Sequence, residues 1–286
     1  MENNREDSLI QSINDLLILN NGVEIPQHGF GVYQIKGEEQ CYNSINKALE
    51  VGYRSFDTAQ FYENEKLVGK VLGKSSINRS ELFITTKVAN YNQGYDNTLR
   101  SVEQSLKDLQ MDQIDLLLVN WPSRKYFLET WKAMEGLYDE KIVRAIGVSN
   151  YEIHHIEELA SKSDIKPALN QVECHPYLTQ EPLYDYLKDQ NIAFEAWSPL
   201  GRGRLLYDHI FVDIAKKYNK SKAQVIIRWH IQKGHIVIPK SSTPSRIEEN
   251  AEVYDFDLSE DEINIIDSLN KNHRNGDAPD QIYLQI

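Results

Sequence analysis

The 286-residue chain has the composition of a globular protein with a sizeable core, because 41% of its residues are hydrophobic and 26% are charged. It carries 43 acidic and 31 basic residues, and its formal net charge of −12 disfavours binding to a nucleic-acid backbone. We therefore expect no nucleic-acid partner. An anionic ligand requires a local basic pocket in this chain.

The sequence carries no sign of secretion or of membrane insertion. The first 15 residues are polar and acidic and lack the basic and apolar regions of a signal peptide. The longest apolar run, residues 116–119, is far too short to span a bilayer. The two cysteines, Cys41 and Cys174, form neither a disulfide framework nor a zinc-binding spacing. We predict a cytoplasmic protein without a membrane partner.

No linker or low-complexity stretch interrupts residues 15–286, which predicts a single domain after a loose tail over residues 1–14. Near the start of this domain, the pair Asn21-Gly22 separates two short apolar runs. Asn-Gly is the preferred pair of a type I′ turn, in which both central residues have positive φ. We expect a short N-terminal β-hairpin at this position.

Strand-like and helix-like patterns then alternate along the chain. Continuous apolar runs are typical of parallel strands that are buried on both faces. Spacings of three and four between apolar residues indicate the helices, and Ser221 with Gln224 and Ser259 with Glu262 resemble capping boxes. Strands are predicted at 31–34, 54–57, 82–87, 114–120, 143–149, 168–172, 193–198 and 235–239, with helices near 41–49, 99–109, 131–138, 153–159, 183–187, 221–231 and after 259.

Eight strands, each followed by a helix or loop, predict an α/β fold of the (β/α)8 TIM-barrel type. The competing fold is a doubly wound sheet. That fold needs a G-x-G-x-x-G turn after its first strand to hold a dinucleotide, and the sequence contains no such run. Residues 69–75 resemble a P-loop, but they have one residue too few and end a helix rather than open one.

Polar residues stand at the carboxyl ends of several predicted strands. In a TIM barrel these ends share one face, which carries the chemistry. Any single polar residue there is commonly a cap or a solvated loop residue, whereas the whole set indicates a site. The set consists of Asp57, Lys87, Asn120, Ser149, Asn150 and Gln171.

Several longer motifs resemble the aldo-keto reductase family, in the bacterial branch that acts on methylglyoxal or diketogluconate. The resemblance covers essentially all of residues 17–286, and its motifs occur in the family's order. The motifs are residues 52–65 (GYRSFDTAQFYENE), 146–150 (IGVSN), 171–176 (QVECHP), 197–201 (WSPLG) and 238–241 (IPKS), the last followed by Arg246, Glu249 and Asn250.

The resemblance implies the catalytic residues. Tyr62 matches the family's general acid, which donates a proton to the carbonyl oxygen as hydride reaches the carbon. Lys87 matches the lysine whose charge favours the phenolate and lowers the tyrosine pKa, and Asp57 matches the carboxylate that pairs with it. Asn120 departs from the pattern, because most family members have histidine there. An amide can also donate a hydrogen bond to the carbonyl, without charge and with a different reach.

The resemblance also implies an NADPH site and a substrate wall. An aromatic residue stacks on the nicotinamide, and a guanidinium with a lysine grips the 2′-phosphate. Substrate contacts are expected from Tyr33, Trp121 and the loop at 90–91. The expected cofactor residues are Ser149, Asn150 and Gln171 at the carboxamide, Trp197 at the ring, Ser198, Leu200 and Gly201 at the pyrophosphate, Lys240, Ser241, Ser242 and Arg246 at the 2′-phosphate, and Glu249 and Asn250 at the adenine.

We therefore predict an enzyme that reduces small aldehydes, 2-oxoaldehydes such as methylglyoxal, or sugar-like ketones to alcohols with NADPH. The alternative is an NADPH-binding regulatory or interaction protein with vestigial activity, because the potassium-channel β-subunits of the same superfamily also have asparagine in place of the histidine. A metal hydrolase is disfavoured, since no strand-end cluster of His and Asp occurs, so we expect no metal. We expect a monomer.

Overall fold

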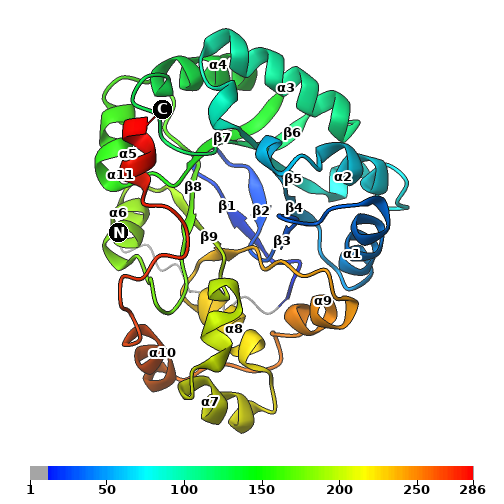
Figure 1. The fold of residues 1–286 in the computed structure, drawn as a ribbon, viewed down its shortest axis with the longest axis vertical. Coiled ribbons are helices and arrows are strands. Elements are labelled where there is room, and N and C mark those ends of the chain that lie inside the picture. The colour runs from blue at the N-terminus through cyan, green and yellow to red at the C-terminus, as the bar shows by residue number, and fades with distance from the viewer. Residues whose placement is uncertain (1–11, 286) are drawn as a thin grey trace, which may run out of the picture.

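The computed structural model describes residues 12–285 and contains one sheet of eight parallel strands. The strands follow one another around the sheet in chain order (Figure 1). They are β3 (Phe30–Gly31), β4 (Ser55–Asp57), β5 (Phe83–Val88), β6 (Ile114–Val119), β7 (Val143–Ser149), β8 (Leu169–Glu173), β9 (Ala193–Trp197) and β10 (Ile236–Val237).

The first and last strands close this sheet into a barrel. His28 pairs in parallel with Val237, and the Gly29 N–H donates to the Val237 carbonyl at 2.9 Å. One step further along this seam, the Gly31 N–H donates to the Pro239 carbonyl at 3.2 Å. Closure leaves the sheet without free edges. The (β/α)8 barrel predicted from the sequence is therefore confirmed.

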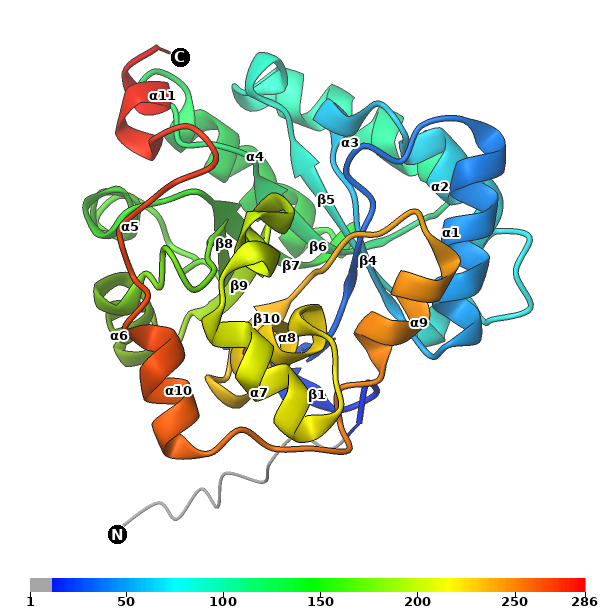
Figure 2. The ribbon, with the colours of Figure 1, turned by 60° about the horizontal axis from the view of Figure 1, so that its bottom comes forward.

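Helices surround the barrel (Figures 1 and 2). None of those described between residues 12 and 285 is long and apolar enough to cross a membrane. They are α1 (Glu38–Glu50), α2 (Glu65–Leu72), α3 (Tyr95–Leu109), α4 (Phe127–Asp139), α5 (Ile153–Ala160), α6 (Glu181–Asp189), α7 (Ile210–Tyr218), α8 (Lys222–Gln232), α9 (Pro244–Ala251), α10 (Glu260–Asp267) and α11 (Pro279–Gln285).

A hairpin of β1 (Leu16–Ile18) and β2 (Glu24–Pro26) lies at the end of the barrel shown lowest in Figure 2. The hairpin is as predicted, but its turn is not of type I′. Gly22 has φ of +84° whereas Asn21 is not in the left-handed region, and the Gly22 N–H donates to the Leu19 carbonyl at 2.9 Å. These features describe a three-residue loop with a bulge at the glycine, which needs only one residue with positive φ.

The predicted element boundaries agree best inside the sheet. Residues 143–149 form β7 as predicted, and β5 and β6 are buried along their whole length. The first strand is shorter and earlier than residues 31–34, because Gln34 turns out of the strand with φ of +60°. Helix α7 was not predicted, since it has no strand of its own before it. Helix α11 is short and polar, and was also missed.

Several local predictions can be checked at helix ends. Both capping boxes are present at the starts of α8 and α10. Gly73 caps the end of α2, so the P-loop-like residues end a helix, as the sequence indicated. Of the predicted N-terminal tail, residues 1–11 lie outside the described residues, and Ile13 packs against the core.

Candidate active site

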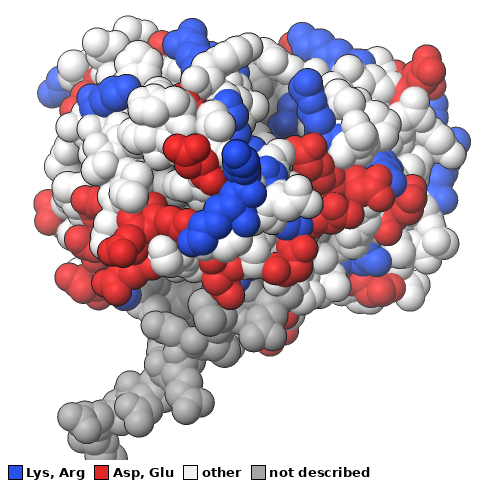
Figure 3. Space-filling view, turned by 90° about the horizontal axis from the view of Figure 1, so that it is seen from below, with Lys and Arg blue, Asp and Glu red and all other residues white. Residues whose placement is uncertain are grey.

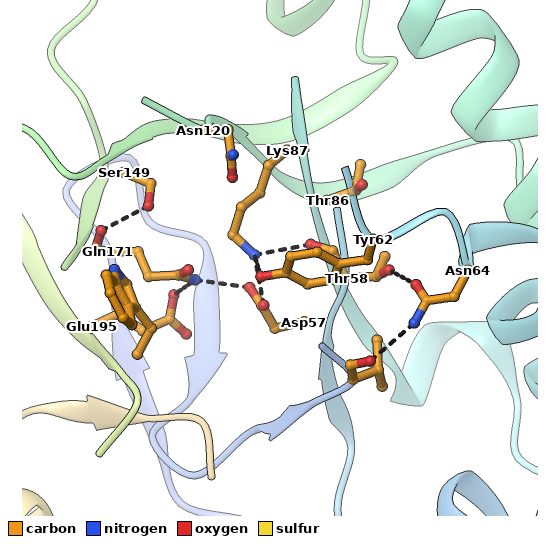
Figure 4. Close-up of polar contacts among 12 residues, drawn as sticks. Asp57, Thr58, Tyr62, Asn64, Thr86, Lys87, Asn120, Ser149, Gln171 and Glu195 are labelled. Carbon is orange, nitrogen blue, oxygen red and sulfur yellow. Dashed lines mark hydrogen bonds and ion pairs between the residues drawn. The ribbon is translucent and has the colours of Figure 1, made fainter. Parts of the chain in front are cut away.

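The carboxyl ends of the strands bring polar side chains to one end of the barrel, which we call the mouth. Asp57 ends β4, Lys87 lies next to the end of β5, and Asn120 directly follows β6. Ser149 ends β7, and Gln171 lies within β8. Figure 4 shows these side chains around a common space. The structure thus brings together residues that are up to 114 positions apart in the chain.

Lys87 is the centre of a buried polar cluster at this mouth. Its ammonium nitrogen lies 2.6 Å from Asp57 Oδ1 and donates to the Thr58 carbonyl at 2.9 Å. The same nitrogen donates to the Tyr62 hydroxyl at 3.3 Å. Lys87 and Asp57 are only 1% and 2% exposed. Such deeply buried charges are tolerated when they are paired and hydrogen-bonded, as they are here.

Tyr62 lies on a short loop, which ring contacts and hydrogen bonds hold next to Lys87. It ends η1, a 3-10 turn over Gln60–Tyr62, and its ring lies against that of Tyr33 with centroids 4.9 Å apart. The buried Asn64 side chain accepts a hydrogen bond from the Thr58 hydroxyl at 2.8 Å and donates to the Val32 carbonyl at 2.9 Å. Asn64 therefore ties the loop to the barrel, a role that sequence reasoning did not assign.

The pKa of Tyr62 is shifted upwards, whereas the resemblance implied a shift downwards. Burial raises the pKa of Tyr62 to about 12, and the opposing effect of the Lys87 ammonium does not cancel this rise. The charge of Lys87 does lower the pKa of Tyr62, as expected, but burial raises this pKa by more. Burial alone would lower the pKa of Lys87, yet the neighbouring Asp57 carboxylate turns the shift into a rise. Tyr62 is thus protonated and Lys87 charged at neutral pH.

A second buried carboxylate, Glu195 of β9, completes the floor of the mouth and was missed in the sequence. The Gln171 amide donates to Asp57 Oδ2 at 2.8 Å and to Glu195 Oε2 at 2.7 Å, so it bridges the two acids. Burial, reinforced by the Asp57 charge, raises the pKa of Glu195 to about 8. The sequence does contain a signal that could have identified Glu195, because a charged residue between Phe194 and Ala196 is unusual in a short buried strand.

Glu195 is expected to make the stability of the protein depend on pH. Between its ordinary pKa of 4.5 and about 8, the folded state holds a proton that the unfolded state has lost. The free energy of unfolding should therefore fall as pH rises through this window.

The variant Glu195→Gln tests this prediction. It should make the free energy of unfolding depend less on pH, which urea unfolding at several pH values measures. Glu39→Gln on the exposed face of α1 is the matched control and should leave the slope unchanged; equal slopes in all three proteins would contradict the assignment.

Asn120 and Asn150 follow β6 and β7 and lie next to each other at the mouth. The Asn150 amide donates to the Asn120 backbone carbonyl at 2.9 Å and to Ser149 Oγ at 3.1 Å. The half-buried Asn120 side chain makes no hydrogen bond to any residue in the described range 12–285 and points into the space beside Lys87 (Figure 4). The indole N–H of Trp197 donates to Asn150 Oδ1 at 2.8 Å, which holds the indole at the same edge.

The remaining expected cofactor residues lie beyond the ends of β9 and β10. Ser198, Leu200 and Gly201 lead from β9 into η4, a 3-10 segment over Gly201–Tyr207. Lys240 and Arg246 are exposed, and neither forms an ion pair within the described part of the chain. Figure 3 shows the side of the molecule that carries α7 and α8, on which Lys and Arg side chains lie among acidic side chains. Ser241 and Ser242 precede α9, which carries Arg246, Glu249 and Asn250.

One of the expected substrate residues lines a cavity at Tyr62, and the shared substrate wall stays a prediction. A cavity of about 240 Å³ lies beside Tyr62 and is lined by Tyr33, Gln34, Lys36, Phe61, Tyr62 and Glu63. Tyr33 thus lies next to Tyr62, and its role as a substrate contact stays a prediction. Trp121 does not line this cavity, and its backbone carbonyl accepts a hydrogen bond from the Gln93 amide at 2.8 Å. Tyr91 lines a separate polar cavity of about 380 Å³ between η3 (Asn90–Asn92) and α3.

Among residues 12–285, two groups of side chains outside the expected catalytic set are spaced closely enough to share a metal ion: Cys174 with His230 and His235, and His154 with His155 and Asp280. In the second group, His155 Nδ1 accepts the Glu152 N–H at 3.1 Å and caps α5. A neutral His155 then carries its proton on Nε2, so that nitrogen cannot bind a metal while the cap is in place.

A family model for the aldo/keto reductases matches residues 29–271. The chain belongs to the aldo/keto reductase family. Glyoxal reductase of Bacillus subtilis is 49% identical to this aldo/keto reductase over 271 residues, which make up 95% of this chain and 98% of that protein. Methylglyoxal reductase DkgA of Escherichia coli K12 is 45% identical over 267 residues, covering 92% and 96% of the two chains.

The fold comparison agrees with the sequence comparison. A crystal structure of a Gox0644 mutant in complex with NADPH has 39% sequence identity to this aldo/keto reductase and a TM-score of 0.89, and the match covers 93% of this chain and 97% of that one. The family and the oxidoreductase class predicted from the motifs are therefore confirmed.

Proposed function

We propose that this aldo/keto reductase reduces small aldehydes and 2-oxoaldehydes such as methylglyoxal to alcohols with NADPH, and that Tyr62 is the proton donor. The observation that carries the proposal is the Tyr62 hydroxyl 3.3 Å from the buried Lys87 ammonium, beside a small cavity at the mouth. The names of the two bacterial relatives, glyoxal reductase and methylglyoxal reductase, support the substrate class.

The proton transfer follows from the charges around Tyr62. Hydride addition to a carbonyl carbon leaves negative charge on the oxygen, which a positioned acid neutralises. Tyr62 holds its proton at neutral pH because burial raises its pKa to about 12. Once the proton has moved to the substrate oxygen, the phenolate that remains faces the Lys87 ammonium, and Asp57 keeps that lysine charged.

The residues at the mouth fit NADPH in their chemistry. Bound NADPH supplies the hydride. Trp197 offers an aromatic face for the nicotinamide, and Ser149, Asn150 and Gln171 offer polar groups for its carboxamide. The 2′-phosphate needs cations that are not already neutralised, and the exposed Lys240 and Arg246 have no acidic partner among residues 12–285. We expect further contacts with NADPH from Ser198, Leu200 and Gly201 at the pyrophosphate, from Ser241 and Ser242 at the 2′-phosphate, and from Glu249 and Asn250 at the adenine.

Lys240 and Arg246 should give the enzyme its preference for NADPH over NADH. Replacing both with Ala is expected to weaken NADPH binding by roughly 10- to 100-fold for each charged side chain removed from the phosphate. NADH binding should change little, because NADH has no 2′-phosphate. Titrations that follow the fluorescence of each reduced cofactor measure both affinities. Equal losses for NADH and NADPH would place the pair away from the phosphate.

Oxidation of NADPH by a panel of carbonyl compounds tests the proposed function directly. Methylglyoxal and glyoxal are expected to be turned over, and loss of the reduced-nicotinamide absorbance reports the rate. Larger sugar-like ketones belong in the same panel, because they test how large a substrate the mouth accepts. Tight NADPH binding without turnover of any member would favour the alternative of a regulatory NADPH-binding protein.

A further inference from the structure

The segment between α10 and α11, residues 268–278, runs along one side of the barrel, and we call it the strap. Figures 1 and 2 show it running from α10 past α6 to α11 beside α5. The strap is tied down along its length. The backbone N–H groups of Lys271 and His273 donate to the Tyr177 carbonyl at 3.1 and 3.0 Å, and the Arg274 guanidinium donates to Glu152 Oε1 at 2.6 Å.

The firmest anchor of the strap is Glu173, a fully buried residue at the end of β8. Its two carboxylate oxygens accept the N–H of Asn275 at 2.7 Å and the N–H of Gly276 at 3.0 Å. Burial opposes ionisation of Glu173, but the hydrogen bonds from His175, Gly276 and Asn275 outweigh it and lower its pKa. A charged acceptor therefore holds two successive backbone amides of the strap beside β9.

Gly276 brings the strap into direct contact with Trp197. A Cβ atom at position 276 would lie 2.6 Å from Cη2 and 3.4 Å from Cζ2 of the indole, too close for any side chain without movement. The φ angle of Gly276 lies outside the left-handed region, so the backbone itself does not demand glycine. The contact with the indole therefore accounts for the glycine.

The indole is thus held at two edges. Asn150 accepts its N–H at 2.8 Å, and the anchored backbone at Gly276 lies against its six-membered ring. We propose that the strap is a positioning element for the cofactor site, in which Gly276, held by Glu173, sets the plane of the Trp197 indole on which the nicotinamide stacks. This inference rests on the proposed function, because it takes the role of Trp197 from there.

Gly276→Ala tests the contact. Because the strap is anchored, the added methyl group should displace the indole, with about 10-fold weaker NADPH binding. Trp197→Phe keeps an aromatic face but has no atoms at the Cζ2 and Cη2 positions. In that background, Gly276→Ala should have little further effect on NADPH affinity. Gly136→Ala on α4, where an added Cβ meets no atom within 4 Å, is the matched control and should bind NADPH normally.

A second measurement needs no cofactor and so separates this inference from the proposed function. Gly276→Ala should alter the near-ultraviolet circular dichroism of the parent protein, in which Trp197 contributes, and leave the spectrum of the Trp197→Phe protein unchanged. Equal spectral and affinity changes in the two backgrounds, or none in either, would overturn the inference. If no variant binds NADPH while the spectra follow the expected pattern, the positioning contact stands and the proposed function fails.

Glu173→Gln tests the anchor separately. The amide can accept only one of the two backbone N–H groups with its oxygen, so hydrogen exchange at Asn275 and Gly276 should become faster. The Trp197 contribution to the near-ultraviolet spectrum should change in parallel. Faster exchange in the strap with an unchanged Trp197 signal would show that the strap and the indole are independent, which contradicts the inference.

Discussion

Tyr62→Phe is expected to fold and bind NADPH with unchanged affinity but to reduce aldehydes about 10²- to 10⁴-fold more slowly. The substitution removes only the hydroxyl group that donates the proton. The ring remains packed against Tyr33 at a tilted angle, and Lys87 keeps its contacts with Asp57 and the Thr58 carbonyl. Steady-state kcat with methylglyoxal measures the loss, and thermal unfolding verifies that the fold is intact.

Tyr42→Phe is the matched control for this change, because Tyr42 is 57% exposed on α1 and has no contact with the mouth. It should behave as the parent protein. Near-normal turnover by the Tyr62 variant would show that another group or a water molecule supplies the proton. The proposed mechanism would then be wrong even though the family assignment holds.

Asn120→Ala should lower kcat by about 10²- to 10³-fold, which is the usual cost of losing one donor to a developing oxyanion. The side-chain amide of Asn120 is not engaged by any residue between 12 and 285, so it is available to the substrate oxygen beside Tyr62. NADPH affinity should stay almost unchanged, because Asn150 contacts the backbone carbonyl of residue 120 and not its side chain.

Asn120→His completes this test, because it restores the residue common in the family. It should preserve or raise the rate of reduction. A vestigial enzyme would respond little to either change. If the alanine variant turned over a broad aldehyde panel as fast as the parent, Asn120 would be a bystander, and Tyr62 with Lys87 would suffice for the reaction.

The barrel was predictable because short strand-like runs alternate with helix-like spacings along the chain, and the run at 114–119 is almost entirely apolar. The predicted limits of β7 agree with the structure at both ends. The prediction was poorest at the seam, where β10 has two residues in place of the five expected. Pro239 has no N–H to donate, which limits regular pairing there, and only the folded chain shows that Gly31 reaches its carbonyl.

The motifs name candidate site residues one by one, and the roles of these residues stay predictions, but the contacts between them could not be predicted from the sequence. The pattern around Asp57 does not show that Gln171 bridges it to Glu195, because that pairing depends on three strands being neighbours in the barrel. The direction of the Tyr62 pKa shift could not be predicted from the sequence either, because burial decides it and burial is a property of the folded state. The strap lies in the least patterned part of the sequence.

The hydrogen bonds of Lys87 limit how a substrate can be held. An ammonium group has three N–H bonds, and here Asp57, the Thr58 carbonyl and the Tyr62 hydroxyl take one each. None is left for a carbonyl oxygen, so Lys87 acts on the proposed reaction through Tyr62, by its charge and its hydrogen bond, and not by contact with the substrate. In the proposed reaction the substrate oxygen is held by two donors, Tyr62 and Asn120. We therefore expect these two side chains, together with Tyr33 and the position of the bound nicotinamide, to select the face of a prochiral ketone that receives hydride.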